Sequence, residues 1–418
     1  MAKKEHTFGI IGVGGYARVY LGATEHLAEL GRGRLVAAAV RSPQKYAEKM
    51  AELEQQGVRF HPDLPTMLRE EALDVVCVPT GISSHVPYSV EAMEGGCDVI
   101  CEKPLCATVQ EAAEMIAARD RLGRKVAIGY QAMYSPVTHE LKRRLVRGDL
   151  GRVRRIRCKS SAPRPDNYYA RNDWAGKQKG SDGRWILDSP ANNAIAHQLQ
   201  QMLFLAGPSA AASGEPARVY AELAHGRPHI DNFDTCAIRV ETAEGVALLY
   251  LASHCVRNGW GPAIEIECER GTVLITGAGT APRGATVVRT PDGREEEIQR
   301  DPGVPNLAYR AFTNMVGALN DGEELLCTPD NTRQQTLVIN AAHDSCGGPA
   351  PIDPSFTGSG DVQYGQRVLP GHYIEGGEDA LARCYDEWKT FSETGVAWAK
   401  TARWIDTAGY EYFPGGKG

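Results

Sequence analysis

The stretch TFGIIGVGGYA, residues 7–17, decides the fold expected for this 418-residue chain. Its first half, residues 7–13, is a short apolar run closed by glycine, which is typical of a buried parallel strand and a tight turn. A helical spacing of apolar residues follows from Tyr16 to Leu30, and Gly31 ends it. The stretch therefore predicts a strand, a turn and a helix in direct succession.

The same alternation of strand and helix continues for about 125 residues. Further strands are predicted at 35–40, 74–79, 97–101 and 125–129, and helices at 43–56, 86–95 and 108–122. Parallel neighbours in a sheet need crossover connections, and helices supply them. We therefore expect an α/β fold whose N-terminal domain is a Rossmann-type, doubly wound parallel sheet.

The glycines of residues 12–17 form the pattern Gly12-x-Gly14-x-x-Ala17, placed between the first strand and the first helix. In a dinucleotide site the first glycine permits the turn and the second lets the backbone approach the pyrophosphate. The small third residue allows close packing, and the helix N-terminus attracts the phosphates. Gly15 and Tyr16 belong to the same turn, so all five residues are assigned to cofactor binding.

The end of the second strand bears on which dinucleotide is bound. NAD sites usually carry an acidic residue there for the ribose hydroxyls. Here the chain reads Val40-Arg41-Ser42-Pro43, with no acid, and Arg41 and Ser42 could hold a 2′-phosphate. This favours NADP over NAD, although Arg41 could instead stack on the adenine.

A second motif, Glu102-Lys103-Pro104, follows the strand at 97–101. The carboxyl ends of parallel strands share one edge of the sheet, so Lys103 is expected to face the bound nucleotide. Glu102 more readily anchors backbone than reacts.

After Tyr130 the pattern changes to that of an α+β domain with an open, mostly antiparallel sheet. Strands are predicted at 152–160, 217–224, 234–241, 246–254, 263–269 and 272–276, with helices at 191–206, 306–319 and 330–345. We expect a cofactor domain (1–130), a substrate and oligomerisation domain (131–346) and a C-terminal extension (347–418). In the extension, residues 347–373 should be largely irregular and 378–392 helical, with an aromatic tail that packs on the second domain or on a neighbouring subunit.

Composition limits the function classes. The net charge of −6 argues against nucleic-acid or membrane-surface binding. No apolar run approaches ~18 residues, and no signal-peptide core precedes the first strand, so a cytoplasmic protein is expected. Eleven cysteines include no Cys-x-x-Cys pair and are interpreted as reduced core residues. No metal site is predicted.

With Gly12-x-Gly14-x-x-Ala17, Glu102-Lys103-Pro104 and a helical His197, residues 7–345 resemble the Gfo/Idh/MocA oxidoreductases. This resemblance implies an NAD(P) cofactor, a sugar, inositol or related polyol as substrate, and a homodimer or homotetramer formed through an exposed sheet face. It also places the segment from Thr80 to His85 near the cofactor, although His85 could be purely structural.

The resemblance further implies roles in catalysis. Lys103 would contact substrate hydroxyls, and His197 would supply acid–base function. Asn193 stands four residues before His197, where the family carries aspartate, so it can touch the substrate but cannot accept a proton. Asp188 could fold back towards the site or cap a turn. Lys103 as a solvated lysine and His197 as a structural histidine stay open alternatives.

A polar, aromatic loop follows the strand at 152–160. Planar rings beside charged and amide groups suit a polyhydroxylated ring, whereas a plain surface loop is the alternative. The residues assigned to substrate are Tyr130, at the exit of the last parallel strand, and Arg164, Asp166, Tyr168, Arg171 and Trp174 of the loop.

The leading hypothesis is an NAD(P)-dependent dehydrogenase acting on a hydroxyl of a sugar, glycoside or polyol. An alternative is a glycosidase or lyase that uses tightly bound, internally recycled NAD through a transient keto-sugar. A non-catalytic nucleotide sensor is a third reading, which Lys103 and His197 together oppose.

Overall fold

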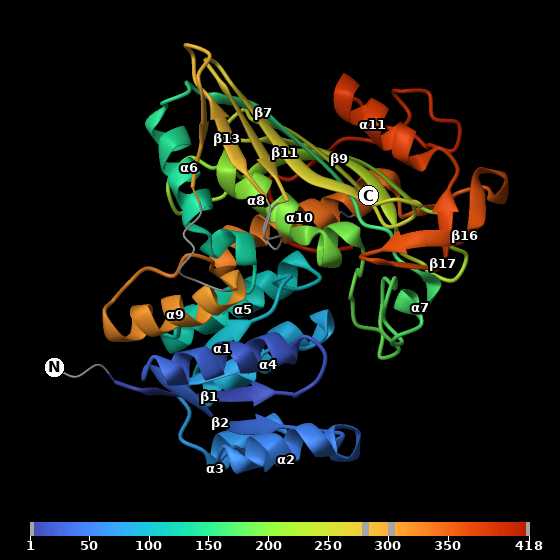
Figure 1. Cartoon of the computed structure of the whole chain (residues 1–418). Helices are drawn as coiled ribbons and strands as arrows, with labels where there is room; N and C mark the ends of the chain where they lie inside the picture. Colours follow the sequence, from blue (N-terminus) through green and yellow to red (C-terminus); the bar gives the residue numbers. More distant parts are fainter. Residues whose placement is uncertain (1–3, 278–283, 300–305, 415–418) are drawn as a thin grey trace. The chain divides into compact units, whose positions relative to one another are not determined.

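The computed structural model describes residues 4–277, 284–299 and 306–414 of the chain (Figure 1). Contacts divide it into two compact units. The first comprises Met1–Cys106, Glu111–Tyr134 and Pro302–Thr332, and the second comprises Ala107–Gln110, Ser135–Asp301 and Arg333–Gly418. The predicted boundaries at residues 130 and 346 differ from this division, because the segment Pro302–Thr332 belongs to the first unit.

The first unit is built on a six-stranded sheet in the order β3-β2-β1-β4-β5-β6, in which every pair is parallel. Phe8, Val76 and Ile100 on its central strands are fully buried, as the continuous apolar runs require. The strands are β1 (His6–Ile11), β2 (Gly33–Ala39), β3 (Arg59–His61), β4 (Val75–Val78), β5 (Asp98–Cys101) and β6 (Val126–Ile128). This is the doubly wound sheet that the sequence predicts.

Helices connect these strands, and one further helix comes from much later in the chain. They are α1 (Ala17–Glu29), α2 (Ala47–Gln55), α3 (Leu64–Glu70), α4 (His85–Glu94), α5 (Val109–Leu122) and α9 (Leu307–Asn320). Phe312 of α9 stacks on Phe8 of β1 and meets Tyr20 of α1 edge-on, with ring centroids 6.0 and 5.0 Å apart. The short elements β3 and α3 were not predicted, because three to seven residues carry little periodicity.

The second unit is built on a ten-stranded sheet. Nine strands follow the order β14-β13-β12-β11-β7-β10-β9-β8-β15, and β18 also pairs with β8. The pairs β7–β10 and β8–β15 are parallel and the others antiparallel. The strands are β7 (Val153–Ser161), β8 (Pro216–His225), β9 (Thr235–Thr242), β10 (Ala247–Ser253), β11 (Trp260–Cys268), β12 (Thr272–Thr276), β13 (Thr286–Arg289), β14 (Glu295–Glu297), β15 (Ala350–Pro351) and β18 (Ile405–Asp406).

One face of this sheet packs against helices of the same unit. Helix α8 (Ala196–Ala206) contacts β7, and nearly all of its residues are buried. Helix α6 (Pro136–Arg147) packs on α8, where the buried Lys142 ammonium donates to the carbonyl of Gly207 at 2.6 Å. Helix α10 (Pro329–Cys346) reaches the segment before α8, because Gln335 donates to the carbonyl of Ala191 at 2.9 Å.

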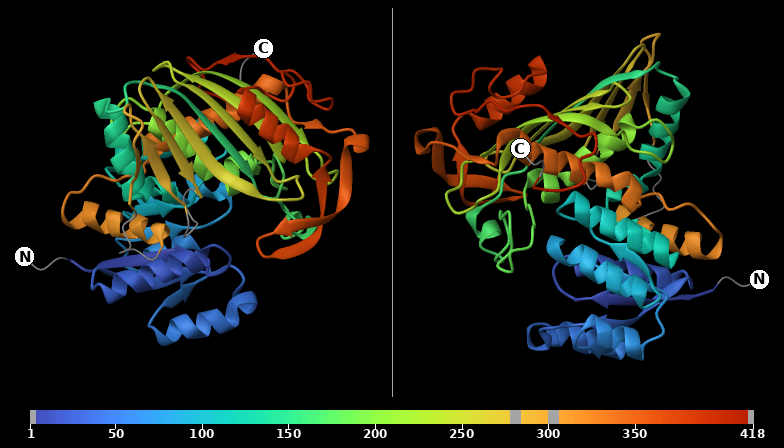
Figure 2. Two further views of the ribbon diagram at one scale, coloured as in Figure 1. Left: turned by 45° about the horizontal axis from the view of Figure 1, so that its top comes forward. Right: turned by 180° about the vertical axis from the view of Figure 1, so that it is seen from behind.

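The C-terminal extension covers part of the opposite face. Helix α11 (Gly377–Glu387) lies on β7 and β10, as the left view of Figure 2 shows. Leu381 and Phe391 of the extension form one buried cluster with Leu249 and Leu251 of β10. The extension therefore shares its core with the sheet.

The expectation that residues 347–373 are irregular is wrong. They contain β15 and a two-stranded hairpin of β16 (Thr357–Tyr364) and β17 (Arg367–Ile374) in continuous antiparallel register. Few of its side chains, among them Val362 and Ile374, are buried. Because the hairpin buries so little, its sequence lacks the apolar alternation that normally reveals strands.

Three further properties concern the described residues only. No helix among them is both long and apolar enough to cross a bilayer. All eleven cysteines, which lie within the described ranges, are free, and ten of them are buried. No group of three or more potential metal ligands occurs in residues 4–277, 284–299 and 306–414.

Candidate active site

The turn after β1 has the backbone conformation of a phosphate cradle. Gly12 and Gly15 have φ angles of +79° and +59°, which favour glycine, and the Gly12 amide donates to the carbonyl of Ala39 at 2.8 Å. Helix α1 begins directly behind the turn at the buried Ala17. The first amides of that helix donate to carbonyl oxygens of the turn itself, so the helix end would attract an anion through its positive dipole.

Gly14 lies where the chain approaches a neighbouring ring. A Cβ atom at this position would lie 2.3 Å from the Tyr46 ring, so only glycine fits. A pocket opens here between the carboxyl ends of the central strands. Its lining includes Gly12, Gly14, Arg41, Ser42, Tyr46, Asp63, Pro79, Thr80 and Tyr88. A dinucleotide fits this donor set, since glycine backbone, cation, hydroxyl and aromatic groups surround one hollow.

The sequence analysis missed several residues of this pocket, of which Tyr46 and Asp63 bear on the cofactor. Tyr46 and Asp63 line it together with the exposed Arg41 and Ser42. The Asp63 carboxylate accepts the amide of Thr66 at 2.8 Å as the N-cap of α3, and bonds with Thr66 lower its pKa. The sequence Asp-Leu-Pro-Thr is a helix-start signal that could have located Asp63. An acid therefore lies in the pocket, although it does not come from β2.

The turn after β5 is organised by the buried Glu102. Its carboxylate accepts the amide of Lys103 at 3.0 Å and the hydroxyl of Tyr20 at 3.3 Å. Burial raises the pKa of Glu102 to about 7, against the opposing effect of the Lys103 charge. Gly129 gives this carboxylate room, because a Cβ there would come within 2.6 Å of it. Glu102 thus supports the backbone that presents Lys103.

His85 holds the same turn from the other side. Its Nδ1 lies 2.7 Å from the carbonyl oxygen of Pro104, and its Nε2 lies 3.2 Å from that of Thr80. The ring is buried, and burial lowers its pKa to about 4, so the neutral form is present near pH 7. A neutral imidazole donates only once, and the shorter contact makes Nδ1–H the donor. His85 therefore positions the Lys103–Pro104 segment.

Two tyrosines that the sequence analysis assigned to binding, Tyr16 and Tyr130, differ in their exposure to solvent. Tyr16, at the start of α1, is 40% exposed and bonds through its hydroxyl to Gln131. Tyr130 is fully buried, and burial raises its pKa well above the ordinary value. Tyr130 thus has no exposed surface for the substrate contact expected of it.

The other catalytic candidates belong to the second unit, just before and within α8. Asn193 does not share an α-helical face with His197 as expected, because Pro190–Ala194 form a π-helical turn that ends at Ile195, before α8 begins. Ser189 begins this turn by accepting the amide of Asn192 at 3.2 Å. The wider turn changes the direction of Asn193 relative to a continuous helix.

Asp188 both folds back and caps backbone, so the two alternatives are not exclusive. Its Oδ1 accepts the Asn193 amide group and its Oδ2 accepts the amide of Gly176, each at 2.6 Å. The carboxyl is buried, with 3% exposure. Because a carboxylate only accepts, it orients the Asn193 side chain with its nitrogen inward and its oxygen away. Asp188 therefore brings a carboxylate into contact with the residue that replaces the family's aspartate.

The loop after β7 brings most of its predicted residues together. Tyr168, on the short helix α7 (Asp166–Tyr169), has the Arg171 guanidinium 3.5 Å and the Arg164 guanidinium 5.0 Å from its ring centroid. The ring centroid of Trp174 lies 5.4 Å from the same Arg171 guanidinium. Asp166 points elsewhere and pairs with His372 of β17 at 2.9 Å. Its partner could not be read from a sequence separation of about 200 residues.

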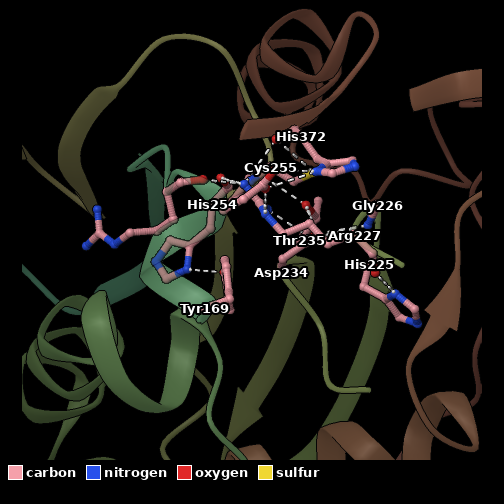
Figure 3. Close-up of polar contacts among 12 residues, drawn as sticks. Tyr169, His225, Gly226, Arg227, Asp234, Thr235, His254, Cys255 and His372 are labelled. Carbon is pink, nitrogen blue, oxygen red and sulfur yellow. Dashed lines mark hydrogen bonds and ion pairs between the residues drawn. The ribbon is translucent and has the colours of Figure 1, made fainter. Parts of the chain in front are cut away.

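Arg227, which the sequence analysis did not single out, ties this loop to the sheet and to the extension (Figure 3). Its fully buried guanidinium pairs with Asp234 at 3.1 Å. It also donates to the carbonyl oxygens of Arg164, His254 and His372 at 2.6, 3.1 and 3.0 Å. One cation thus joins three distant segments.

Comparisons with known proteins agree with this geometry. Residues 6–130 match the model of an oxidoreductase family with an NAD-binding Rossmann fold, and residues 138–274 match the GFO/IDH/MocA C-terminal domain. Inositol 2-dehydrogenase 4 of Saccharopolyspora erythraea is 27% identical over 285 residues, covering 66% of this chain and 75% of that protein. Its paralogue, inositol 2-dehydrogenase 1, is 26% identical, covering 59% and 64%.

Solved structures show the same fold. The aldose-aldose oxidoreductase from Caulobacter crescentus, complexed with glycerol, superposes with a TM-score of 0.66 at 21% identity, covering 81% of this chain and 97% of that one. The WlbA dehydrogenase from Bordetella pertussis, in complex with NADH and UDP-GlcNAcA, also has a TM-score of 0.66, at 20% identity, with coverage of 81% and 96%.

Proposed function

Because the chain belongs to the Gfo/Idh/MocA family of oxidoreductases, we propose that it is an NAD(P)-dependent dehydrogenase. It transfers a hydride to or from a hydroxyl-bearing carbon of a sugar, glycoside or polyol. The observation that carries this function is the combination of a glycine cradle at Gly12–Ala17 with Lys103 presented at the same sheet edge. Relatives named inositol dehydrogenases, and a structural neighbour solved in complex with UDP-GlcNAcA, support a polyhydroxylated substrate.

The cofactor would be held by the residues of the pocket in the first unit. Gly12, Gly14, Gly15 and the start of α1 would bind the pyrophosphate, and Arg41 and Ser42 would bind the adenosine end. When bound, the nicotinamide ring exchanges hydride with the carbinol carbon. The protein supplies position, polarity and proton transfer.

Four residues would polarise the substrate, transfer its proton and hold it in position. Lys103 polarises the reacting oxygen with its ammonium charge. His197 takes or returns the hydroxyl proton, since imidazole titrates near neutral pH. Asn193 hydrogen-bonds the substrate through the orientation that Asp188 imposes. Asp188 itself acts through Asn193 and is a positioning residue.

The test is replacement of Lys103 by Met. Turnover should fall by at least about a hundredfold, because one preorganised charge contributes roughly 3–4 kcal/mol to the transition state. NAD(P)H binding, measured by fluorescence, should be unchanged. Lys49→Met, which removes a surface lysine paired with Glu52, serves as the matched control. Wild-type turnover in Lys103→Met would refute the assignment.

We further propose that NADP is preferred over NAD. Arg41 and Ser42 offer a cation and a hydroxyl at the pocket, which suit a 2′-phosphate. Asp63 in the same lining would oppose that phosphate, so the preference should be modest. Dissociation constants for the two cofactors decide it, and tighter binding of NAD would reverse the assignment.

The alternative of redox-neutral glycoside cleavage is not favoured. The sequence relatives named above are dehydrogenases. Net reduction of added NAD(P) by a polyol separates the two reactions.

A homodimer or homotetramer in the cytoplasm is also proposed. Leu274, 42% exposed on β12, supports association through the part of the sheet beside the extension. Trp260, 45% exposed on β11, borders the extension, with its ring centroid 6.2 Å from that of Tyr385. Light scattering measures the assembly, and a monomer at all concentrations would contradict it.

A further inference from the structure

The loop after β7 carries cations that lack carboxylate partners. Within the part of the chain that the structure describes, neither Arg164 nor Arg171 forms an ion pair. Most other arginines on this sheet do, as Arg155 pairs with Glu267 and Arg157 with Glu265, each at 2.7 Å. Asp166 of the same loop pairs with His372 instead. The charges of Arg164 and Arg171 are therefore not neutralised by a carboxylate contact among the described residues.

A buried histidine, His254, lies next to these two arginines and also needs a hydrogen-bond partner. His254 is 2% exposed, and its Nδ1 lies 3.1 Å from the hydroxyl of Tyr169 (Figure 3). Its Nε2 is buried and has no hydrogen-bond partner among the described residues. If the Tyr169 hydroxyl donates to Nδ1, only the Nε2–H of His254 lacks a partner. If Nδ1–H donates to the hydroxyl instead, both Nε2 and the hydroxyl hydrogen lack one. The first arrangement is favoured, so Nε2 carries a hydrogen and needs an acceptor.

These donors surround one side chain. The ring centroid of His254 lies 6.1 Å from that of Tyr168, whose ring also contacts both guanidinium groups. The Arg164 Nε is likewise buried without a partner. Arg164, Arg171 and His254 thus lie together beside Tyr168, and no acceptor among the described residues satisfies the buried Nε of Arg164 or the buried Nε2 of His254. The complementary ligand is an anion.

The loop that carries Arg164 and Arg171 contacts the candidate catalytic residues of the same unit. The ring of Tyr169 packs against Gly176, whose amide donates to Asp188, and Asp188 holds Asn193. A ligand on the cluster would therefore be positioned by the segment that orients Asn193. The connection runs through one packing contact, between Tyr169 and Gly176, and then through two hydrogen bonds of 2.6 Å.

We propose that Arg164, Arg171 and His254 form a subsite for the anionic group of an acidic sugar, either the carboxylate of a sugar acid or a phosphate ester. This inference rests on the proposed function, because it specifies the substrate of that reaction. The Arg227 network supports the subsite by holding the Arg164 and His254 backbone through their carbonyl oxygens. Tyr168 supplies a planar surface against which a sugar ring can lie.

The experiment measures binding by the full chain in the presence of saturating NADPH, so that oxidation of the sugar does not proceed. Titration calorimetry compares glucuronate with glucose, galacturonate with galactose, and glucose 6-phosphate with glucose. At least one anionic sugar should bind roughly tenfold more tightly than its neutral partner, since charge-assisted hydrogen bonds contribute to only one of them. The preference should weaken as salt increases. The comparisons with glucuronate and galacturonate test for a carboxylate, and the comparison with glucose 6-phosphate tests for a phosphate.

Variants locate the effect. Arg171→Gln should reduce the preference by roughly tenfold while the affinity for the neutral sugar stays the same, and Arg171→Lys should retain part of it. Arg171 is exposed, so the variant should fold. Arg294→Gln, at an exposed arginine paired with Asp292, removes the same charge elsewhere and should change nothing.

Three results would overturn the proposal: no binding of any anionic probe, equal affinity within every pair, or an Arg171→Gln variant that weakens both members alike. Failure of the proposed function is distinguished separately. It would appear as an absence of NAD(P) reduction with every sugar, whether or not the binding preference is observed.

Discussion

Glu102 places a carboxyl group in the core of the first unit, where burial raises its pKa from 4.5 to about 7. Between these values the unfolded chain has lost the proton while the folded protein retains it. Stability therefore falls as pH rises through this window. A shift of this size corresponds to roughly 3 kcal/mol at pH 8.

Glu102→Gln should remove this pH dependence. Glutamine keeps an oxygen that can accept the Lys103 amide but carries no charge, so the variant should match wild type near pH 4 and exceed its stability at pH 8. Thermal unfolding midpoints of both proteins, measured without cofactor across that range, provide the test. A constant difference between the two curves would show that the Glu102 carboxyl does not titrate there.

At the scale of single elements, the turn between β1 and α1 depends on the ring that faces it. Gly14→Ala should weaken NAD(P)H binding by at least about tenfold, because the new methyl group meets Tyr46 at 2.3 Å and displaces the pocket wall. Tyr46→Ala in the same chain should restore space and recover part of the affinity. Fluorescence titration of both variants measures this, and unchanged binding in Gly14→Ala would contradict it.

One of the contacts that hold the β16–β17 hairpin comes from the buried cation Arg227, which lies outside it. Arg227→Met removes the donor to the carbonyl of His372 and leaves the carboxylate of Asp234 buried without its charge partner. Losing one partner of a buried pair costs roughly 3–5 kcal/mol. We expect a lower unfolding temperature and faster proteolytic cleavage within residues 357–374.

The control for this prediction is an exposed pair of the same sheet. Arg218 and Glu241 are joined at 2.7 Å across β8 and β9, and both are nearly half exposed. Arg218→Gln should cost less than about 1 kcal/mol and leave the hairpin intact. Equal effects of the two substitutions would show that Arg227 does not fasten the hairpin.

At the scale of the whole chain, the C-terminal extension completes the core of the second unit. Phe391 is 1% exposed and packs with Leu249 and Leu251 on the sheet. Phe391→Ser should therefore destabilise the second unit by roughly 3–5 kcal/mol and increase binding of a hydrophobic dye. Tyr364→Ser, at a tyrosine 37% exposed on the hairpin, is the matched control and should have little effect. A stable, dye-free Phe391→Ser protein would contradict this role.

Local patterns of the sequence determined much of the first unit. The alternation of apolar strands and helices predicts five of the six parallel strands. The positive φ angles at Gly12 and Gly15 follow from a turn that glycine alone adopts readily. Lys103 at the end of β5 follows in the same way, because position along a strand decides the edge of the sheet to which a side chain belongs.

Tertiary structure alone decided the contacts that organise the second unit. The π-helical turn at Asn193, the bond from Asn193 to Asp188, and the pairing of Asp166 with His372 leave no periodic trace in the sequence. The same holds for Arg227, whose partners come from three separate segments. The physical reason is the sequence separation of the interacting residues. Backbone geometry and periodicity are set by residues a few positions apart. A buried charge is instead paired with groups that only the completed fold brings next to it.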